Sequence, residues 1–286
     1  MFYKNHIEKI YIVNGLARSG NHLFISWLIS TFNNDEVYYL NNIKLYEHGL
    51  ISDKNLDIET IQKYHTVTNN NKYGLKIDET IRKNLVSTKK MNDFLHNKKS
   101  IKILIFTMEN KKINKIDWIN NIFINCKNKY NIIVIRDILN LFSSRLQSEK
   151  KLEKKNGYYE TDKITIDWWM NNYSHIKKKK YITFNYNKFL CYTVSRKSLA
   201  KKLDIDYNKA KITLNLFGLT SGSSFKNNIT NKSDYFMRWT KYKNHSLIKS
   251  LLHDNKIIEI LCKDFSMCLN IDNKKIKICK KLYNLE

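Results

Sequence analysis

The chain has 286 residues and a formal net charge of +25, with 42% hydrophobic and 13% aromatic residues. This apolar content suits one α/β domain and excludes a disordered chain, while 7 glycines and 5 cysteines exclude a collagenous or disulfide-scaffold protein. Proline is absent, although average usage predicts about 14 in a chain of this length. The bias of an AT-rich genome explains this scarcity and also favours Lys, so the charge alone is weak evidence for a nucleic-acid or anionic-membrane partner.

The amino terminus and the cysteines predict a cytoplasmic protein without a bound metal. Residues 1–6 lack the apolar stretch of a signal peptide, and no apolar run approaches the roughly 20 residues that span a bilayer. The cysteines are odd in number and form no CxxC pair, so we expect reduced, mostly buried thiols and no metal site. They are Cys126, Cys191, Cys262, Cys268 and Cys279.

Strands and helices alternate along much of the chain. A β-branched and aromatic run predicts a buried strand at 9–14, and apolar residues from Leu23 to Phe32 recur at helical spacing after a short loop. Further strands are predicted at 101–106, 131–135 and 181–186, and further helices from 139 onward, at 168–176, at 195–203 and at 246–265. The polar segment 33–97 shows no clear period, and we expect helices and loops over the sheet edge there.

This alternation predicts the fold class. Continuous apolar strands that alternate with helices are typical of a parallel sheet covered on both faces. We therefore expect an α/β three-layer sandwich with a central parallel sheet, built as a single domain over residues 1–286.

The segment Gly15–His22, GLARSGNH, is the most informative part of the sequence. A glycine-bounded turn from a strand into a helix lets backbone N–H groups converge on an anion, and the helix N-terminus adds its positive end. The G-x4-G spacing matches the start of a Walker A loop, but Asn21 and His22 replace the Lys and the Ser or Thr that hold phosphates and Mg²⁺. Arg18, one of only six arginines, suits bidentate contact with phosphate or sulfate oxygens. The loop therefore predicts an anion site that works without a metal.

The run from Arg18 to Phe24, RSGNHLF, closing on Trp27 and Leu28, resembles the 5′-phosphosulfate loop of the sulfotransferase family. The resemblance implies a P-loop NTPase-like fold and transfer of the sulfuryl group of 3′-phosphoadenosine 5′-phosphosulfate (PAPS) to a hydroxyl or amine, with adenosine 3′,5′-bisphosphate (PAP) as product. Many cytosolic members carry Lys-Ser-Gly-Thr-Thr here, whereas carbohydrate-directed and bacterial members often show Arg-Ser-Gly. The residues that the resemblance places around the 5′ end of the cofactor are Ala17, Arg18, Ser19, Gly20, Asn21 and His22.

The resemblance implies a second signature, in which a strand ends in Arg and the next helix carries Ser eight residues later. Arg136 and Ser144 fit this spacing, and both would bind the 3′-phosphate of the cofactor. A later Gly/Ser segment resembles the loop that closes over the same phosphate, with Ser223 and Ser224 as its candidate ligands.

The catalytic roles follow from the same resemblance. Arg18 and His22 would stabilise the charge of the leaving phosphate, and a general base must take the proton of the acceptor. Glu109, near the carboxyl end of the strand predicted at 101–106, is our candidate for this base, and Glu47-His48 is the competing place. The expected acceptor is a small molecule or a glycan, because Arg-Ser-Gly loops favour carbohydrate acceptors by resemblance.

Two other classes of function stay open at this point. A P-loop kinase or other NTPase shares the fold and the glycine spacing, but it needs a loop Lys and Mg²⁺ ligands where this chain has Asn21 and His22. A basic non-enzymatic nucleic-acid binder would agree with the charge of +25. No groove-reading or zinc motif accompanies that charge, so we expect no specific nucleic-acid partner.

Overall fold

The computed structural model divides the chain into two compact units. Unit 1 comprises Met1–Ile135, Asp167–Phe184 and Lys197–Gly222, and unit 2 comprises Arg136–Ile166, Asn185–Arg196 and Ser223–Glu286. The structure describes residues 7–32, 37–41, 44–46, 55–57, 60–67, 72–82, 85–87, 102–109, 126–152, 162–210 and 236–265. That the whole chain forms a single domain stays a prediction.

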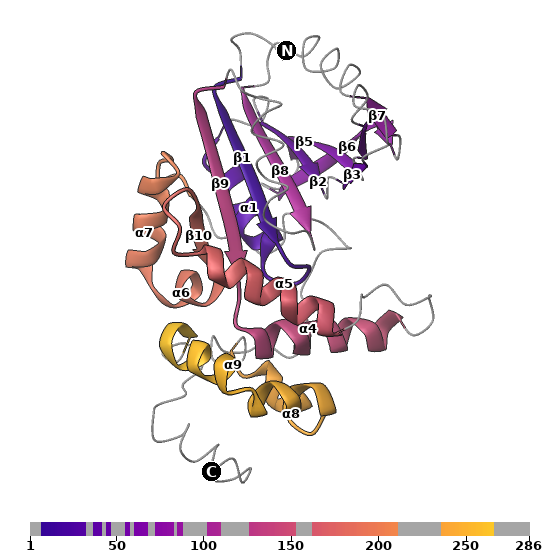
Figure 1. Cartoon of the computed structure of the whole chain (residues 1–286). Helices are drawn as coiled ribbons and strands as arrows, with labels where there is room; N and C mark the ends of the chain where they lie inside the picture. The colour runs from indigo at the N-terminus through magenta and orange to yellow at the C-terminus, as the bar shows by residue number, and fades with distance from the viewer. Residues whose placement is uncertain are drawn as a thin grey trace. The chain divides into compact units, whose positions relative to one another are not determined.

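A sheet with a parallel centre organises unit 1 (Figure 1). β1 (Lys9–Gly15) pairs in parallel with β8 (Ile103–Glu109) on one side and β9 (Asn128–Ile135) on the other, and β2 (Val37–Asn41) continues the parallel arrangement beside β8. β10 (Ile182–Asn185) lies next to β9, while β5 (Thr60–Val67) and β6 (Lys72–Arg82) extend the other end in antiparallel pairing. The α/β class with a parallel sheet is confirmed, and it is consistent with a three-layer sandwich.

The core of unit 1 forms on both faces of β1. Ile10, Tyr11 and Ile12 have no exposed area, and because side chains alternate between the faces of a strand, both faces are covered. The predicted first helix is α1 (Asn21–Ile29), in which Phe24 is also fully buried. Its ring centroid lies 4.9 Å from that of Phe184 in β10. This packing fixes α1, and hence the loop that precedes it, against the sheet.

The expectation for segment 33–97 is wrong in the parts that the structure describes. In place of helices and loops, the segment contributes β2, β5 and β6 to the main sheet. β3 (Lys44–Tyr46), β4 (Asn55–Asp57) and β7 (Leu85–Ser87) form a second, three-stranded sheet. The pairings β2–β5, β5–β6, β3–β4 and β4–β7 are antiparallel. Antiparallel ladders are made by backbone groups, so a polar composition hides them from a search for apolar periodicity.

Most described helices outside α1 follow the predicted positions with changes at their ends, but the helices at 186–191 and 238–242 were not predicted. The described helices outside α1 are α4 (Ile138–Leu152), α5 (Asp162–His175), α6 (Tyr186–Cys191), α7 (Thr193–Lys202), α8 (Ser246–His253) and α9 (Asn255–Ile260), with short η4 (Arg238–Tyr242) and η5 (Leu261–Phe265). The single helix predicted at 246–265 is divided at Asp254. Its carboxylate accepts the backbone N–H groups of Lys256 and Ile257 at 2.9 and 3.1 Å, which starts α9 as a new helix.

The described cysteines differ from the expectation of mostly buried thiols. Cys126 and Cys262 are half-buried, Cys191 is exposed, and none of the three forms a disulfide. Burial raises the pKa of the Cys126 thiol, which opposes formation of a reactive thiolate. Among the residues that the structure describes, no helix combines the length and the apolar character needed to cross a bilayer.

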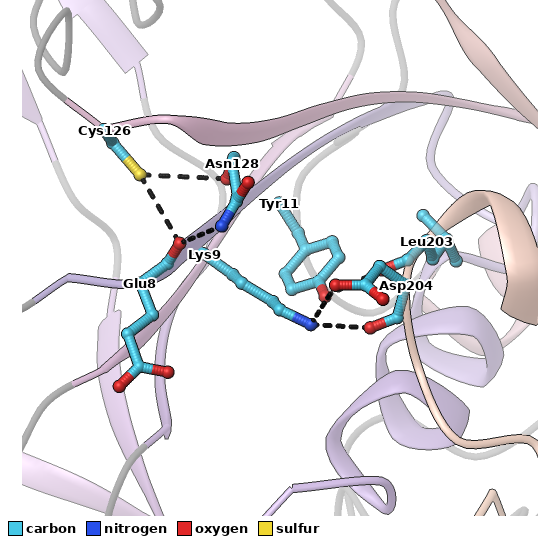
Figure 2. A network of polar contacts seen from close by, with 7 residues as sticks. All are labelled: Glu8, Lys9, Tyr11, Cys126, Asn128, Leu203 and Asp204. Carbon is cyan, nitrogen blue, oxygen red and sulfur yellow. Dashed lines mark hydrogen bonds and ion pairs between the residues drawn. The ribbon is translucent and has the colours of Figure 1, made fainter.

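The amino end of β1 is tied to the end of α7 within unit 1 (Figure 2). Lys9 Nζ lies 2.7 Å from Asp204 Oδ2 and donates to the Asp204 carbonyl at 2.6 Å. Beside this ion pair, the Tyr11 hydroxyl donates to the Leu203 carbonyl at 3.1 Å. The Tyr11 ring stacks on Tyr130 of β9 with the ring centroids 4.9 Å apart. These contacts hold the chain after α7 against the amino end of β1 and against β9.

Candidate anion-binding loop and buried arginine cluster

The loop Gly15–His22 leaves the carboxyl end of β1, in the middle of the parallel part of the sheet. In the strand register Gly15 lies opposite Glu109 of β8 and opposite Val134 of β9. Ligands of open α/β sheets bind at the carboxyl ends of the strands. The structure therefore places the loop and Glu109 together at the edge where such a ligand is expected.

Successive residues of this loop alternate between negative and positive backbone φ angles. The Ser19 N–H donates to the Leu16 carbonyl at 3.0 Å, which closes a four-residue turn. Arg18 has φ 73 and Gly20 has φ 105, while Ser19 between them is not left-handed. Consecutive residues of alternating hand turn their N–H groups toward one point and make an anion-binding concavity. This geometry supports an anion site independently of the sequence motif.

The N-terminus of α1 adds to the same feature. Gly20 is its N-cap and provides no side-chain hydrogen bond, and the first turn of the helix has no acidic residue. The positive end of the helix dipole is therefore left for an outside anion. Ala17, Arg18 and His22 are half-buried around this end.

Asn21 fills the interior of the loop, where a Walker A loop has its Lys. Its side chain is 4% exposed, and its amide Nδ2 donates to Glu109 Oε1 at 2.8 Å and to the Leu16 carbonyl at 3.4 Å. The Ser19 hydroxyl donates to Asn21 Oδ1 at 3.0 Å. Three residues that the sequence nominated, Ser19, Asn21 and Glu109, are thus joined in one hydrogen-bonded chain.

Gly15 is required by this packing. A Cβ atom at residue 15 would lie 2.2 Å from Asn21 Oδ1, 2.8 Å from Ser19 Oγ and 2.9 Å from Val134 Cβ. All three distances are shorter than side-chain contacts allow. The glycine therefore makes room for the Asn21 amide beneath the loop.

Unit 2 contains a separate cluster of buried arginines. Arg136 follows β9 directly and is 3% exposed, and its guanidinium lies 4.6 Å from the centroid of the Tyr186 ring. Ser144, in the next helix α4, is 5% exposed. Beside Ser144, Arg145 is 3% exposed and donates from Nη1 to Thr165 Oγ1 at 2.8 Å. A guanidinium offers paired N–H donors that suit phosphate oxygens, so Arg136 and Ser144 stay the candidates for an anionic group in this unit.

A network of buried amides around Asp137 holds the start of α4 and was missed by the sequence analysis. Asp137 Oδ1 accepts the backbone N–H of Asn140 at 2.8 Å and its side-chain amide at 2.9 Å, and Oδ2 accepts Asn187 Nδ2 at 2.8 Å. Asn187 Oδ1 in turn accepts the backbone N–H of Asp137 at 3.1 Å. Complete burial raises the pKa of the Asp137 carboxyl, against the opposing effects of Arg136 and these amides. Asp137 three residues before Asn140 is a helix-capping signal, whereas nothing in the sequence marks Asn187.

The same network reaches the residues before η4. Asn140 Nδ2 donates to the Phe236 carbonyl at 2.7 Å, and the backbone N–H of Trp239 donates to Asn140 Oδ1 at 3.2 Å. Arg238, between these two residues, is 7% exposed. Through these two bonds Asn140 holds the segment that carries Arg238, the third buried arginine of unit 2.

Several nominated residues lie outside the described part of the chain. They are Ser223 and Ser224, together with the competing candidate base at Glu47-His48. Among the described residues, no group of three or more His, Cys, Asp or Glu side chains is arranged to hold a metal ion. Comparison with protein-family models and with curated proteins finds no match to this chain.

Proposed function

We propose that the protein is a PAPS-dependent sulfotransferase. The observation that carries the proposal is the loop Gly15–His22, whose alternating backbone and uncapped helix N-terminus suit an anion, and which encloses an amide at Asn21. The resemblance of Arg18–Phe24, RSGNHLF, to the phosphosulfate loop of sulfotransferases implies that this anion is the 5′-phosphosulfate of PAPS. The 5′-phosphosulfate is assigned to this loop in unit 1.

The side chain at residue 21 argues against the alternative of a P-loop kinase or NTPase. A Walker A loop needs a cation at this position to hold the β- and γ-phosphates and a hydroxyl next to it for Mg²⁺. Here Asn21 is neutral and its amide is engaged by Glu109, Leu16 and Ser19. Residue 21 therefore lacks the charge that the lysine of a Walker A loop supplies to a metal-bound triphosphate.

Unit 2 supplies the second part of the proposal. The resemblance assigns the 3′-phosphate of the cofactor to Arg136 and Ser144, which are 3% and 5% exposed. A guanidinium offers paired N–H donors to phosphate oxygens, and the Tyr186 ring against its face restricts its motion. Arg145 is instead engaged by Thr165, which favours a structural role for that residue.

The proposed reaction moves SO₃ from the cofactor to an acceptor hydroxyl or amine. The acceptor oxygen or nitrogen bonds to sulfur, the bond from sulfur to the bridging oxygen of the 5′-phosphate breaks, and PAP leaves. Arg18 and His22 stabilise the charge that grows on the leaving phosphate. Glu109 takes the acceptor's proton on Oε2, because Oε1 accepts from Asn21. We propose a small molecule or a glycan as the acceptor.

A thermal-shift experiment with PAP, ATP and GTP, each with and without Mg²⁺, tests this proposal. A ligand at a hundred times its Kd adds about 2.7 kcal/mol to the apparent stability. We expect PAP to raise the melting temperature without Mg²⁺ and more than either triphosphate. Arg136→Ala should lose this shift, while Arg196→Ala is the matched control, because Arg196 is engaged by the Phe189 carbonyl and Thr193. Stabilisation by ATP or GTP that depends on Mg²⁺, or an unchanged PAP shift in Arg136→Ala, would contradict it.

A further inference from the structure

A carboxylate lies against the loop that is proposed to bind an anion. Glu109 is the last residue of β8, opposite Gly15 in the register, and its Oε1 is 2.8 Å from Asn21 Nδ2. A negative charge beside an anion site weakens binding, and it weakens it more for a ligand group with more charge. A loop selected only for strong anion binding would not keep Glu109 in this place.

Asn21 is what keeps the Glu109 carboxylate there. One amide donates to Glu109 and to the Leu16 carbonyl and accepts from Ser19, so its orientation is determined at both of its polar atoms. The side chain is also 4% exposed, and the absence of a Cβ at Gly15 leaves the space that Asn21 Oδ1 occupies. The neutral amide positions Glu109 without cancelling its charge, whereas a Lys at residue 21 would cancel it.

We propose that the Asn21–Glu109 pair sets the charge selectivity of the loop, so that a terminal sulfuryl group is accepted and a terminal phosphoryl group is rejected. The inference rests on the proposed function and adds a specificity-determining role to it. The two groups have nearly the same size and shape. A terminal sulfate carries one negative charge, whereas a terminal phosphate carries between about 1.5 and 2 near pH 7, because its second pKa is about 6. Repulsion by Glu109 therefore penalises the phosphate.

The matched ligands for a test are PAPS and its isostere adenosine 3′-phosphate 5′-diphosphate, which differ only in the terminal group. Titration calorimetry without metal measures the ratio of their dissociation constants. We expect the wild type to prefer PAPS by about tenfold, the size of effect that one extra charge produces at a half-buried site. In Glu109→Gln, which keeps an oxygen for Asn21 to donate to, the ratio should fall to about twofold or less. Glu8→Gln removes an exposed carboxylate at the other end of β1 and should leave the ratio unchanged.

The dependence on pH gives a second measurement that needs no variant. Between about pH 7.5 and 5.5 the terminal phosphate gains a proton and the sulfate does not, so the wild-type preference should decrease toward that of Glu109→Gln. A ratio that is the same in the wild type and Glu109→Gln, or that is independent of pH, would overturn the inference. If neither ligand binds the wild type, the proposed function itself fails, which is a different outcome.

Discussion

Two non-glycine residues of the described chain adopt a left-handed backbone, and they lie near opposite ends of the same strand. Arg18, with φ 73, follows the carboxyl end of β1, and Asp204, with φ 51, lies beside its amino end. Both belong to unit 1. The left-handed region costs a residue with a Cβ atom roughly 1–2 kcal/mol, so each instance needs a cause.

The conformation of Asp204 is explained by helix termination. The Ile205 N–H donates to the Ala200 carbonyl at 3.1 Å and the Asp204 N–H to the Lys201 carbonyl at 3.3 Å, the bonding pattern that ends a helix with a left-handed residue. Asp tolerates this region better than most residues, and its carboxylate forms the ion pair with Lys9. Local structure therefore accounts for the backbone here.

The conformation of Arg18 has no such cause. Arg18 precedes α1, so it ends no helix, and it occupies the third position of the turn Leu16–Ser19, where a positive φ favours Gly or Asn. A glycine would make the same turn at lower cost. Helix termination therefore does not account for the Arg18 backbone, and its strain agrees with the proposed binding role, because strained backbone is concentrated at functional sites.

The largest effect is expected from Gly15→Ala, which tests whether the carboxyl end of β1 is as tightly specified as its packing indicates. The new Cβ would displace Asn21 Oδ1 and press on Val134 Cβ, which belongs to the neighbouring strand and has no freedom to move. We expect a loss of about 3 kcal/mol in the free energy of unfolding. Urea denaturation measures it.

Gly20→Ala is the matched control for Gly15→Ala. It places a Cβ on a residue with φ 105, so its cost is backbone strain of roughly 1–2 kcal/mol without the displacement of Asn21. Equal losses in the two variants would show that Gly15 is required for flexibility and not for the packing of Asn21.

The variants Arg18→Gly and Asp204→Gly test whether the left-handed backbone serves ligand binding at residue 18 and helix termination at residue 204. Arg18→Gly removes left-handed strain and should gain about 0.5–1 kcal/mol of stability while weakening PAPS binding at least about tenfold. Asp204→Gly removes similar strain together with the ion pair to Lys9, so its net change in stability should be close to zero. Its affinity for PAPS should equal that of the wild type.

Calorimetric titration of PAPS and urea denaturation of both variants provide the two readouts. A loss of stability in Arg18→Gly without a loss of affinity would reverse the comparison, since it would make Arg18 the structural residue. Arg18→Lys, which keeps a charge but not the paired donors, should bind with intermediate affinity.

Three of the parallel strands were readable from the sequence because they are buried on both faces, whereas β2, which pairs in parallel with β8, was not. β1, β8 and β9 each contain an uninterrupted apolar run, such as Ile132–Ile135, and such a run has few other interpretations. The strands of segment 33–97 were missed because their signal lies in backbone pairing, and the break at Asp254 because one cap ends a longer apolar pattern.

Individual residues of the candidate site could be predicted from the sequence, whereas the contacts between them could not. Arg18 and Arg136 stood out because arginine is scarce in this chain, and glycine at residue 15 because few glycines remain. The contact between Asn21 and Glu109 joins residues 88 positions apart, and it depends on the register of β1 against β8, which no local pattern encodes. For the same reason the pairing of Asp137 with Asn187 could not be predicted.

The last expected effect concerns the amino end of β1, where Tyr11→Phe tests the attachment of the chain after α7. Tyr11 has no exposed area, and its hydroxyl donates to the Leu203 carbonyl at 3.1 Å, so removing the hydroxyl should cost about 1 kcal/mol at pH 7.

The same hydroxyl makes the stability depend on pH. Burial, then the neighbouring Tyr130 and Asp204, raise the pKa of Tyr11 above its ordinary value of 10.0. The native state therefore binds the phenolic proton more tightly than the unfolded state does, and the stability that this supplies is present below pH 10 and is lost as pH rises above it. We expect the stability difference between wild type and Tyr11→Phe in urea to shrink between pH 9 and about pH 11. Tyr207→Phe, a half-buried tyrosine of the same unit, is the control. A difference that stays constant over this range would show that Tyr11 titrates alike in the native and unfolded states, so that burial does not raise its pKa.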